Sequence, residues 1–314
     1  MEEVQIKPNW LIIVNPNAGN KKCGNDWPQI RTIIESNLPD PEFLLTTRRL
    51  EAIGFAENAV KQGFRKIAVA GGDGTLNEVV NGIMNCNEIS DGEVMVGMIP
   101  VGTGNDWCRM YDIPFDYSEA IEIIKREKTA LQDIGSVSFS DSGVSLNRWF
   151  INVTGLGYDA VVAMKTNKDK ERGKGTSLAY KMNMFSCLLS YKTLKSKITI
   201  DGNSIDRAVF SMNVGVCKYN GGGMIQVPEA IPDDGILDLT IINKIARWKV
   251  VANTKKLYNG TIKSLPFVEI YKAKDIKIEA GGRMYIEVDG ESLGTDPFHF
   301  TIVPSAIRVV SGKE

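Results

Sequence analysis

Histidine is almost absent from this sequence, which contains only His299 among its 314 residues. Catalysis by a histidine pair and a histidine-rich metal site are therefore disfavoured, and acid–base chemistry must fall to Asp, Glu or Lys. The five cysteines are scattered and form no CxxC pair. This spacing argues against a zinc site and fits a reducing cytoplasm.

The sequence also lacks long apolar runs and an excess of charge of either sign. Its apolar runs reach about ten residues, whereas a membrane-spanning helix needs roughly 20. The net charge of −1 provides no overall field that would hold nucleic acid. The first residues, MEEVQIKPNW, are unlike a secretory signal. We therefore expect a cytoplasmic protein without a transmembrane segment, which binds no nucleic acid and which could act peripherally at the inner face of the membrane.

The first 134 residues alternate short apolar strands with amphipathic helices. We expect strands at residues 10–14, 43–45, 66–70 and 94–99, and helices at residues 30–35, 52–62, 76–84 and 118–127. This alternation is typical of a parallel sheet covered by helices on both faces. The sequence therefore predicts an α/β fold class, with a doubly wound domain over residues 1–134.

The pattern changes near Asp133, after which apolar residues mostly recur with period two. A mainly antiparallel β-sandwich is expected over residues 135–300, with one helix at residues 177–194. Two strand-like runs lie within residues 298–310. Residues 301–314 are expected to form a C-terminal strand that could return to the first domain. No low-complexity linker marks the boundary.

The stretch Gly71-Gly72-Asp73-Gly74-Thr75 follows a predicted strand and opens a predicted helix. Glycines permit a close approach of the backbone, and the free N–H groups of a helix N-terminus attract anions. An Asp-Gly turn that merely caps the helix is the alternative. Because two glycines precede the acid and Gly-Thr follows it, we favour a phosphate-binding turn.

A second glycine-rich turn, PVGTGND, follows another predicted strand and ends in Asp106. The ends of successive parallel strands lie at the same edge of a sheet, where ligands bind, so Asp73 and Asp106 are expected to face one cleft. Two carboxylates beside a polyphosphate are explained if they hold Mg²⁺, directly or through water. Asp133 is a third candidate carboxylate, and a turn residue in DIG is an equal alternative.

Two acidic turns in the second half each allow two interpretations. The segment VDGE, residues 288–291, could supply a carboxylate base, but from the residues alone we favour a hairpin turn. The segment PEAIPDDGILDL, residues 228–239, could direct acids and carbonyls at a hard cation. The tetrapeptide PDDG is equally a good turn.

Two further segments bear on access to lipid. Residues 165–174 are rich in Lys and Arg, lack an apolar face and are expected to form a solvated loop. The predicted helix at 177–194 carries an apolar stripe that includes Met182, Phe185, Leu188 and Leu189. Such a stripe is expected to pack on a core more often than on lipid.

The motifs GGDGTLNEVVNGI and PVGTGNDWCR closely resemble the nucleotide loops of the diacylglycerol kinase-like lipid kinase family, in its soluble bacterial branch. The segments NPNAG, INVTGLGYDA, PEAIPDDGILDL and VDGE resemble other signatures of that family, in the right order along nearly the whole chain. The resemblance implies an ATP- and Mg²⁺-dependent kinase that phosphorylates a lipid hydroxyl, of diacylglycerol or a related lipid, in a cleft between two domains.

Position by position, the resemblance also implies roles for individual residues. ATP would contact Asn15, Thr46, Gly71, Gly72, Asp73, Gly74, Thr75, Leu76, Asn77, Thr103 and Asn105. Asp73, Asp106 and Asp133 would form an acidic network around Mg²⁺, and Asp234 with the carbonyls of Ile231 and Ile236 would bind a second, structural Mg²⁺. Either Glu291 or Asp289 would take the proton from the acceptor hydroxyl, beside the catalytic acid Asp73.

The sequence departs from the family in one place, because RRLEA follows Thr47 where the family has a Gly-Asp-Ala or Gly-His-Ala turn. An NAD kinase-like enzyme is one rival, since it shares GGDGT, but a TPTGS(T)AY-type signature is absent. A nucleotide- or lipid-binding sensor without catalysis is another, and the intact acids argue against it. The expected partner is a lipid at the membrane surface. The acceptor lipid is left open, and so is a homodimer.

Overall fold

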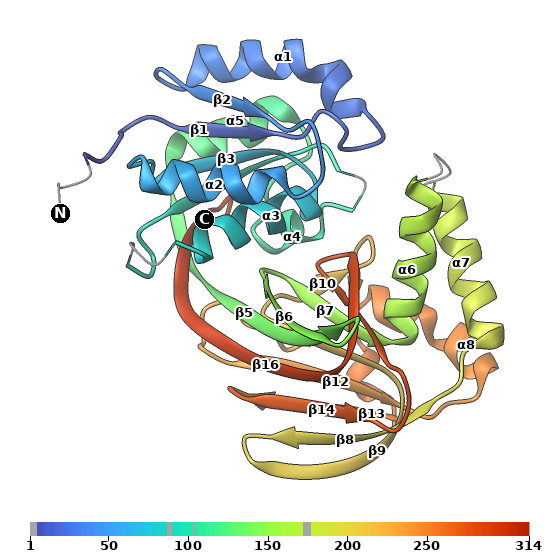
Figure 1. The fold of residues 1–314 in the computed structure, drawn as a ribbon. Coiled ribbons are helices and arrows are strands. Elements are labelled where there is room, and N and C mark those ends of the chain that lie inside the picture. Colours follow the sequence, from blue (N-terminus) through green and yellow to red (C-terminus); the bar gives the residue numbers. More distant parts are fainter. Residues whose placement is uncertain (1–4, 87–89, 103, 172–176, 314) are drawn as a thin grey trace. The chain divides into compact units, whose positions relative to one another are not determined.

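The computed structural model describes residues 5–86, 90–102, 104–171 and 177–313. The chain divides into two compact units, residues 1–134 with 304–314 and residues 135–303, which are considered separately below (Figure 1). The predicted fold class is confirmed, because a helix-covered parallel sheet and a mainly antiparallel β region are both present. Among the described residues, no helix is both long and apolar enough to cross a bilayer.

The first unit is built on a parallel sheet. Its strands are β1 (Leu11–Val14), β2 (Glu42–Leu45), β3 (Lys66–Gly71) and β4 (Met95–Pro100), in the order β2-β1-β3-β4. The end of the long strand β16 (Glu291–Val310) adds to β4 in parallel, through Arg308 and Val309. The continuous apolar runs of β1, β3 and β4 are explained because strands of a parallel sheet are buried on both faces.

The described residues of this unit form five helices, of which three connect the strands and two follow β4. They are α1 (Lys22–Asn37), α2 (Glu51–Lys61), α3 (Asp73–Met84), α4 (Asp106–Met110) and α5 (Tyr117–Arg126). The predicted helix at 30–35 is only the second half of α1, whose first half, KCGNDWPQ, has few apolar residues and contains Pro28. The sequence therefore predicted that this helix exists, but it did not predict the residue at which the helix begins.

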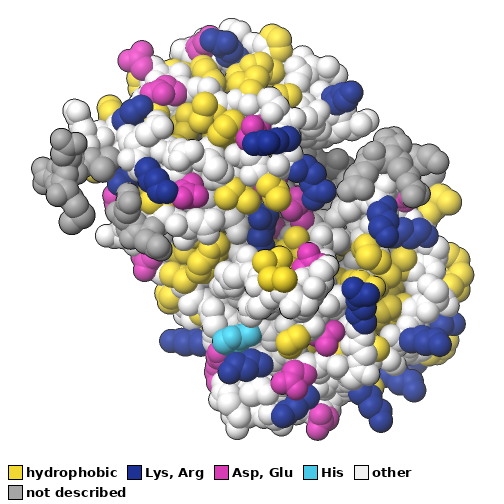
Figure 2. All heavy atoms as spheres, in the orientation of Figure 1, with side chains coloured by type: hydrophobic (Ala, Val, Ile, Leu, Met, Phe, Trp, Pro, Cys, Tyr) yellow, Lys and Arg dark blue, Asp and Glu magenta, His cyan; other side chains and the backbone are white. Residues whose placement is uncertain are grey.

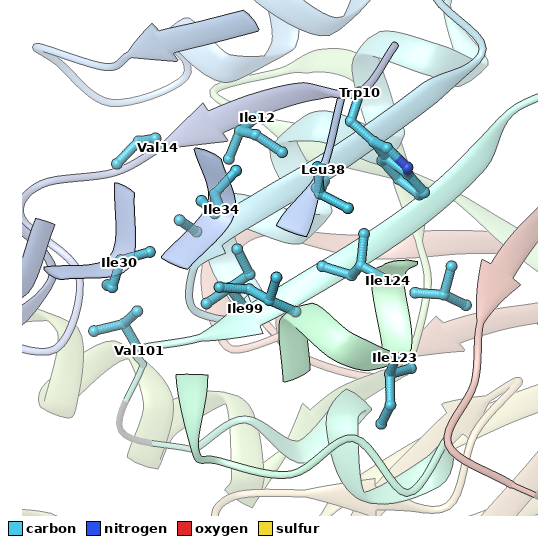
Figure 3. Close-up of a cluster of buried hydrophobic side chains, with 14 of the residues drawn as sticks. Trp10, Ile12, Val14, Ile30, Ile34, Leu38, Ile99, Val101, Ile123 and Ile124 are labelled. Atoms are coloured by element: carbon cyan, nitrogen blue, oxygen red, sulfur yellow. The ribbon is translucent and has the colours of Figure 1, made fainter. Parts of the chain in front are cut away.

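One part of the core of this unit lies between the sheet and helices α1 and α5. Ile30 and Ile34 of α1 and Ile124 of α5 pack in one cluster with Ile12 and Val14 of β1, all fully buried (Figure 3). Helices α2 and α3 pack against each other elsewhere in the unit. Burial of each large aliphatic side chain stabilises the fold by about 1.5–3 kcal/mol, so this cluster fixes the sheet edge from which the glycine turns emerge.

The turns that follow β1, β3 and β4 touch one another through their backbones. A Cβ atom on Gly19 would lie 2.2 Å from the carbonyl oxygen of Val101. A Cβ atom on Gly102 would lie 2.6 Å from the Cα of Gly72. Glycine is required at these contacts because any side chain would force two backbones apart.

The second unit is mainly antiparallel, with β9 paired to β7, β8 and β12. Its strands are β5 (Thr129–Asp141), β6 (Val144–Phe150), β7 (Val153–Gly157), β8 (Leu194–Ile200), β9 (Asn203–Gly215), β10 (Tyr219–Asn220), β11 (Met224–Ile225), β12 (Leu237–Asn243), β13 (Val268–Ala273), β14 (Ile276–Ala280), β15 (Tyr285–Val288) and most of β16. The two strand-like runs predicted within 298–310 are wrong as separate strands, because β16 continues through both.

Three longer helices belong to this unit: α6 (Tyr158–Glu171), α7 (Ser177–Ser190) and α8 (Arg247–Tyr258). The prediction of a loop at 165–174 is wrong for residues 165–171. Helix α6 continues through these residues, which are polar but compatible with a helix. The apolar stripe of α7 is divided: Leu188 is buried, whereas Met182, Phe185 and Leu189 are exposed. Helix α8 was not predicted, and a short 3₁₀ helix (Ile262–Ser264) follows it.

The contact between Gly72 and Gly102 leads to a stability prediction. Gly102→Ala should lower the free energy of unfolding by about 1–3 kcal/mol, because the new methyl group meets backbone that cannot rotate away. Urea denaturation measures the difference. Gly54→Ala in α2 is the matched control, since nothing lies within 4 Å of its Cβ position, and it should raise stability by up to about 1 kcal/mol. Equal stability of the Gly102→Ala and unaltered proteins would contradict the contact.

Candidate functional site

Asparagine side chains join the turns of the first unit. Asn15 donates from Nδ2 to Oγ1 of Thr75 at 2.9 Å, which links the turn after β1 to the start of α3. Asn105 donates to the carbonyl oxygen of Gly102 at 2.9 Å and has a left-handed backbone, with φ of 49°. Its Oδ1 is buried and has no hydrogen-bond partner among the described residues. The turns therefore present an unused acceptor beside the N-terminus of α3, whose first amides attract anions.

The carboxylate of Asp73 is held by the start of α4. It accepts hydrogen bonds from the amides of Asp106 at 3.2 Å and Trp107 at 3.3 Å. A Cβ atom placed on Gly104 would lie 3.1 Å from Oδ2 of Asp73 and 3.5 Å from Oδ2 of Asp106. Both carboxylates thus reach the same small space, which only glycine leaves open. Two carboxylate oxygens at one point suit a hard cation such as Mg²⁺.

The third predicted carboxylate has a different neighbour. Asp133 is fully buried and accepts a hydrogen bond from the amide of Ser305 at 2.7 Å, so it ties β5 to β16 within this unit. Asp106 also lies 3.5 Å from Nε of Arg109. In the described parts of the chain, no three acidic, histidine or cysteine side chains group as metal ligands. The structure thus brings Asp73 and Asp106 together and places Asp133 at the contact between β5 and β16.

The other residues predicted to contact ATP lie at varying depths. Thr46 follows β2 at the same sheet edge, and its amide donates to the carbonyl oxygen of Val14 at 2.8 Å. Leu76 and Asn77 of α3 are fully buried, and Asn77 accepts a hydrogen bond from Asn81. Thr103 lies outside the described residues. Thr46 is therefore placed near the turns, whereas the side chains of Leu76 and Asn77 are buried in the interior of the unit.

In the second unit, VDGE forms a two-residue hairpin between β15 and β16. Asp289 and Gly290 both have positive φ, and Val288 pairs with Glu291 across the turn. The carboxylate of Asp289 accepts three backbone hydrogen bonds of 2.9–3.1 Å, from Ile151, Asn152 and Val153. The side chain predicted as a possible base therefore fixes the start of β7.

Glu291, the other candidate base, lies in a more accessible position. Its side chain is 18% exposed, and Oε2 lies 3.6 Å from an Nη atom of the buried Arg148. Asp289 is only 6% exposed and already accepts three amides. Geometry therefore favours Glu291 over Asp289 as the carboxylate that can meet a substrate hydroxyl.

Two buried acids of the second unit were not found from the sequence. Glu287 is fully enclosed and accepts hydrogen bonds from Asn220 and from the amide of Gly290, both at 2.7 Å. Burial raises the pKa of Glu287 to about 8. Burial likewise raises the pKa of Asp159, which accepts a hydrogen bond from Ser211 at 2.6 Å. Nothing in the pattern GYDA or IEV signals this burial, because it arises from contacts with segments far away in the sequence.

The loop predicted to bind a structural metal already has a cation beside it. Lys272 on β13 places Nζ 2.9 Å from the buried Asp238 and 3.5 Å from Asp234. The other oxygen of Asp234 accepts the amide of Ile236 at 3.1 Å, and the side chain of Ile231 is exposed. A lysine ammonium group therefore neutralises the acid that was predicted to hold the second Mg²⁺.

The raised pKa of Glu287 predicts how stability depends on pH. An acid whose folded-state pKa exceeds its usual value of 4.5 stabilises the fold at low pH, and that contribution is lost as pH rises towards about 8. Between pH 5 and pH 8, this group should lower the free energy of unfolding by up to about 1.4 kcal/mol per pH unit. Urea titrations at several pH values should find a flatter profile for Glu287→Gln.

The matched control is Glu279→Gln, at an exposed position of β14. Its pH profile should follow that of the unaltered protein. An identical slope for Glu287→Gln and the unaltered protein would show that Glu287 does not hold its proton in the folded state.

Both halves of the chain match family models. Residues 9–137 match the diacylglycerol kinase catalytic domain, and residues 152–311 match the YegS C-terminal NAD kinase beta sandwich-like domain. A diacylglycerol kinase of Staphylococcus haemolyticus is 30% identical over 96% of this chain and 88% of its own length. A diacylglycerol kinase of Staphylococcus aureus is also 30% identical, over 96% of this chain and 92% of its own length.

Solved structures agree on the fold. A crystal structure of a diacylglycerol kinase from Bacillus anthracis has a TM-score of 0.75 and 24% identity, and the match covers 97% of each chain. Yeast NADH kinase complexed with NADH has a TM-score of 0.54 and 14% identity, over 97% of this chain and 84% of that one. The family models and the relatives at 30% identity settle the family. The chain belongs to the diacylglycerol kinase-like lipid kinases, and it is a phosphotransferase with an alcohol acceptor.

Proposed function

We propose that this protein transfers the γ-phosphate of ATP, in the presence of Mg²⁺, to a hydroxyl group of diacylglycerol or a related lipid. The observation that carries the proposal is the convergence of Asp73 and Asp106 on the space beside Gly104, at a sheet edge lined by glycine turns. Membership of the family supports a phosphotransferase, and relatives named diacylglycerol kinase support the choice of lipid.

For the nucleotide, the proposal assigns the turns of the first unit. The amides at the start of α3 would cradle phosphate oxygens, as helix N-termini commonly do. The bond between Asn15 and Thr75 would hold that helix start against the turn after β1. The unpaired Oδ1 of Asn105 would accept a hydrogen bond from the ligand or from a water molecule bound to it.

Asp73 and Asp106 would hold Mg²⁺, and their chemistry fits the preference of that ion for oxygen ligands and retained waters. When bound, the ion neutralises charge on the phosphates that react. The amides of Asp106 and Trp107 at the start of α4 hold the carboxylate of Asp73 in place. Asp133, through Ser305, would act as a positioning residue that ties β16 to this sheet.

For the acceptor, the proposal assigns Glu291 as the base. It would take the hydroxyl proton as the lipid oxygen bonds to the γ-phosphorus and the bond from that phosphorus to the β–γ bridging oxygen breaks, so that ADP leaves. A carboxylate is the expected choice because the chain holds a single histidine. The hairpin between β15 and β16 fixes its backbone, and Arg148 lies beside its carboxylate. Asp289 would keep that hairpin anchored to β7 through its three amide contacts.

A labelled-ATP assay with a panel of lipids, and with NAD in parallel, tests the proposal. Label should enter an organic-extractable product made from diacylglycerol or a related lipid. Asp73→Asn and Glu291→Gln should each lower kcat by roughly 10²–10⁴-fold, because each removes charge stabilisation or proton transfer. Asp141→Asn, at an exposed strand end, is the control and should leave the rate unchanged.

Label in NADP instead of lipid would support the NAD kinase alternative; the yeast NADH kinase resembles this chain in fold. Binding of ATP without transfer to any lipid would support a sensor. Either result would contradict the proposed function.

A further inference from the structure

Helix α7 exposes a narrow stripe of large apolar side chains. Met182, Phe185 and Leu189 are 65%, 59% and 56% exposed. They are three and four positions apart, so they lie on one face of the helix. On another face, Cys187 and Leu188 are buried against β9 and α6 in a cluster with Phe210. The stripe is therefore not needed to hold α7 on its own unit.

Helix α8 repeats this arrangement. None of its residues is buried, and Trp248, Val251 and Tyr258 are 68%, 54% and 47% exposed. Their spacings of three and seven place them on one face. Val250, on a different face, packs against the same cluster as Leu188 of α7. Two neighbouring helices thus rest on one cluster and both present apolar side chains to solvent.

The chain segments that contain these helices carry charged residues of one sign only. Between Asp238 and Glu269 the chain has no acidic residue, but it has six basic ones: Lys244, Arg247, Lys249, Lys255, Lys256 and Lys263. From residue 177 to residue 200 there is again no acidic residue, and four lysines are present: Lys181, Lys192, Lys195 and Lys197. The whole chain has 37 basic and 38 acidic residues, so this is a local segregation of charge.

The basic side chains of α8 are also not neutralised by the protein. Arg247, Lys249, Lys255 and Lys256 form no ion pair among the residues that the structure describes. In the space-filling view, yellow side chains lie beside dark-blue ones over the region of α7 (Figure 2). The surface therefore combines unpaired positive charge with exposed aromatic and aliphatic groups.

We propose that the apolar stripes of α7 and α8, with the cations of α8, form a docking surface for a lipid bilayer that contains anionic headgroups. Here, docking surface means Met182, Phe185, Leu189, Trp248, Val251 and Tyr258 together with Arg247, Lys249, Lys255 and Lys256. Aliphatic and Phe side chains enter the acyl boundary, whereas Trp and Tyr prefer the interface between water and lipid. Lys and Arg are attracted to anionic lipids at the same depth.

The choice of a bilayer over a protein partner follows from this combination. A protein partner would need a large acidic face to match so many cations, and an interface between two copies would set like charges against each other. A bilayer with anionic lipids satisfies the positive charge and the apolar stripes at once. Such a docking surface would bring the protein to its lipid acceptor, which deepens the proposed function. The reason for binding a bilayer rests on that function, whereas the binding itself does not.

Co-sedimentation with vesicles tests the docking surface without any measurement of catalysis. The unaltered protein should bind vesicles of phosphatidylcholine with about one third phosphatidylglycerol, and should be released by high salt or by omission of the anionic lipid. Phe185→Ser with Trp248→Ser should weaken binding at least tenfold. Arg247→Gln with Lys255→Gln should weaken it about 25-fold, at about fivefold per charge.

Matched controls test whether vesicle binding depends on this docking surface or on any exposed apolar or basic side chain. Val144→Ser with Leu146→Ser removes apolar side chains that are 59% and 44% exposed on β6, away from α7 and α8 in the sequence. Lys125→Gln with Arg126→Gln removes two exposed cations of α5. Both control proteins should bind vesicles as the unaltered protein does, and all variants should keep its melting temperature, because every altered side chain is exposed.

Several results would overturn the docking surface. These are no binding of the unaltered protein to anionic vesicles at low salt, equal loss in the control variants, or full binding by both α7–α8 variants. A dimer that dissociates in Phe185→Ser with Trp248→Ser, without vesicle binding, would assign the surface to a second copy instead. Phosphorylation of a water-soluble, short-chain diacylglycerol tests the proposed function separately, so failure of one claim is distinguished from failure of the other.

Discussion

The first unit depends on one contact, the bond between the Asp73 carboxylate and the amides that begin α4. It explains why an acid can stand in a turn suited to phosphate, because the helix amides stabilise its charge. The neighbouring backbone contact of Gly72 with Gly102 brings the two turns close enough for this bond to form.

In the second unit, backbone amides again hold a carboxylate, here that of Asp289. Asp289 gathers three amides and thereby fixes the hairpin that presents Glu291. Beside Asp234 and Asp238 the charges are reversed, because there the ammonium group of Lys272 lies close to two carboxylates. In each case a charged side chain is satisfied by groups far away in the sequence, so rigid loops are built from long-range contacts and not from local turns alone.

Particular residues show what the sequence could predict. The apolar run Leu11–Val14 and the motif GGDGT revealed a strand, a turn and a helix because their signals are local. The three amides on Asp289, the burial of Glu287 and the cation at Lys272 depend on strand pairings that no local pattern encodes. Helix α8 was missed because it buries no residue, and its exposed apolar side chains alternate with Lys and Arg.

A crystal structure of the protein with Mn²⁺ and a non-hydrolysable ATP analogue tests the central claim most directly, because anomalous scattering locates the metal. The account predicts a manganese peak beside Gly104, bound to Asp73 and Asp106 directly or through one water, with the phosphates at the start of α3. A nucleotide bound elsewhere, or a metal that neither aspartate reaches, would contradict it.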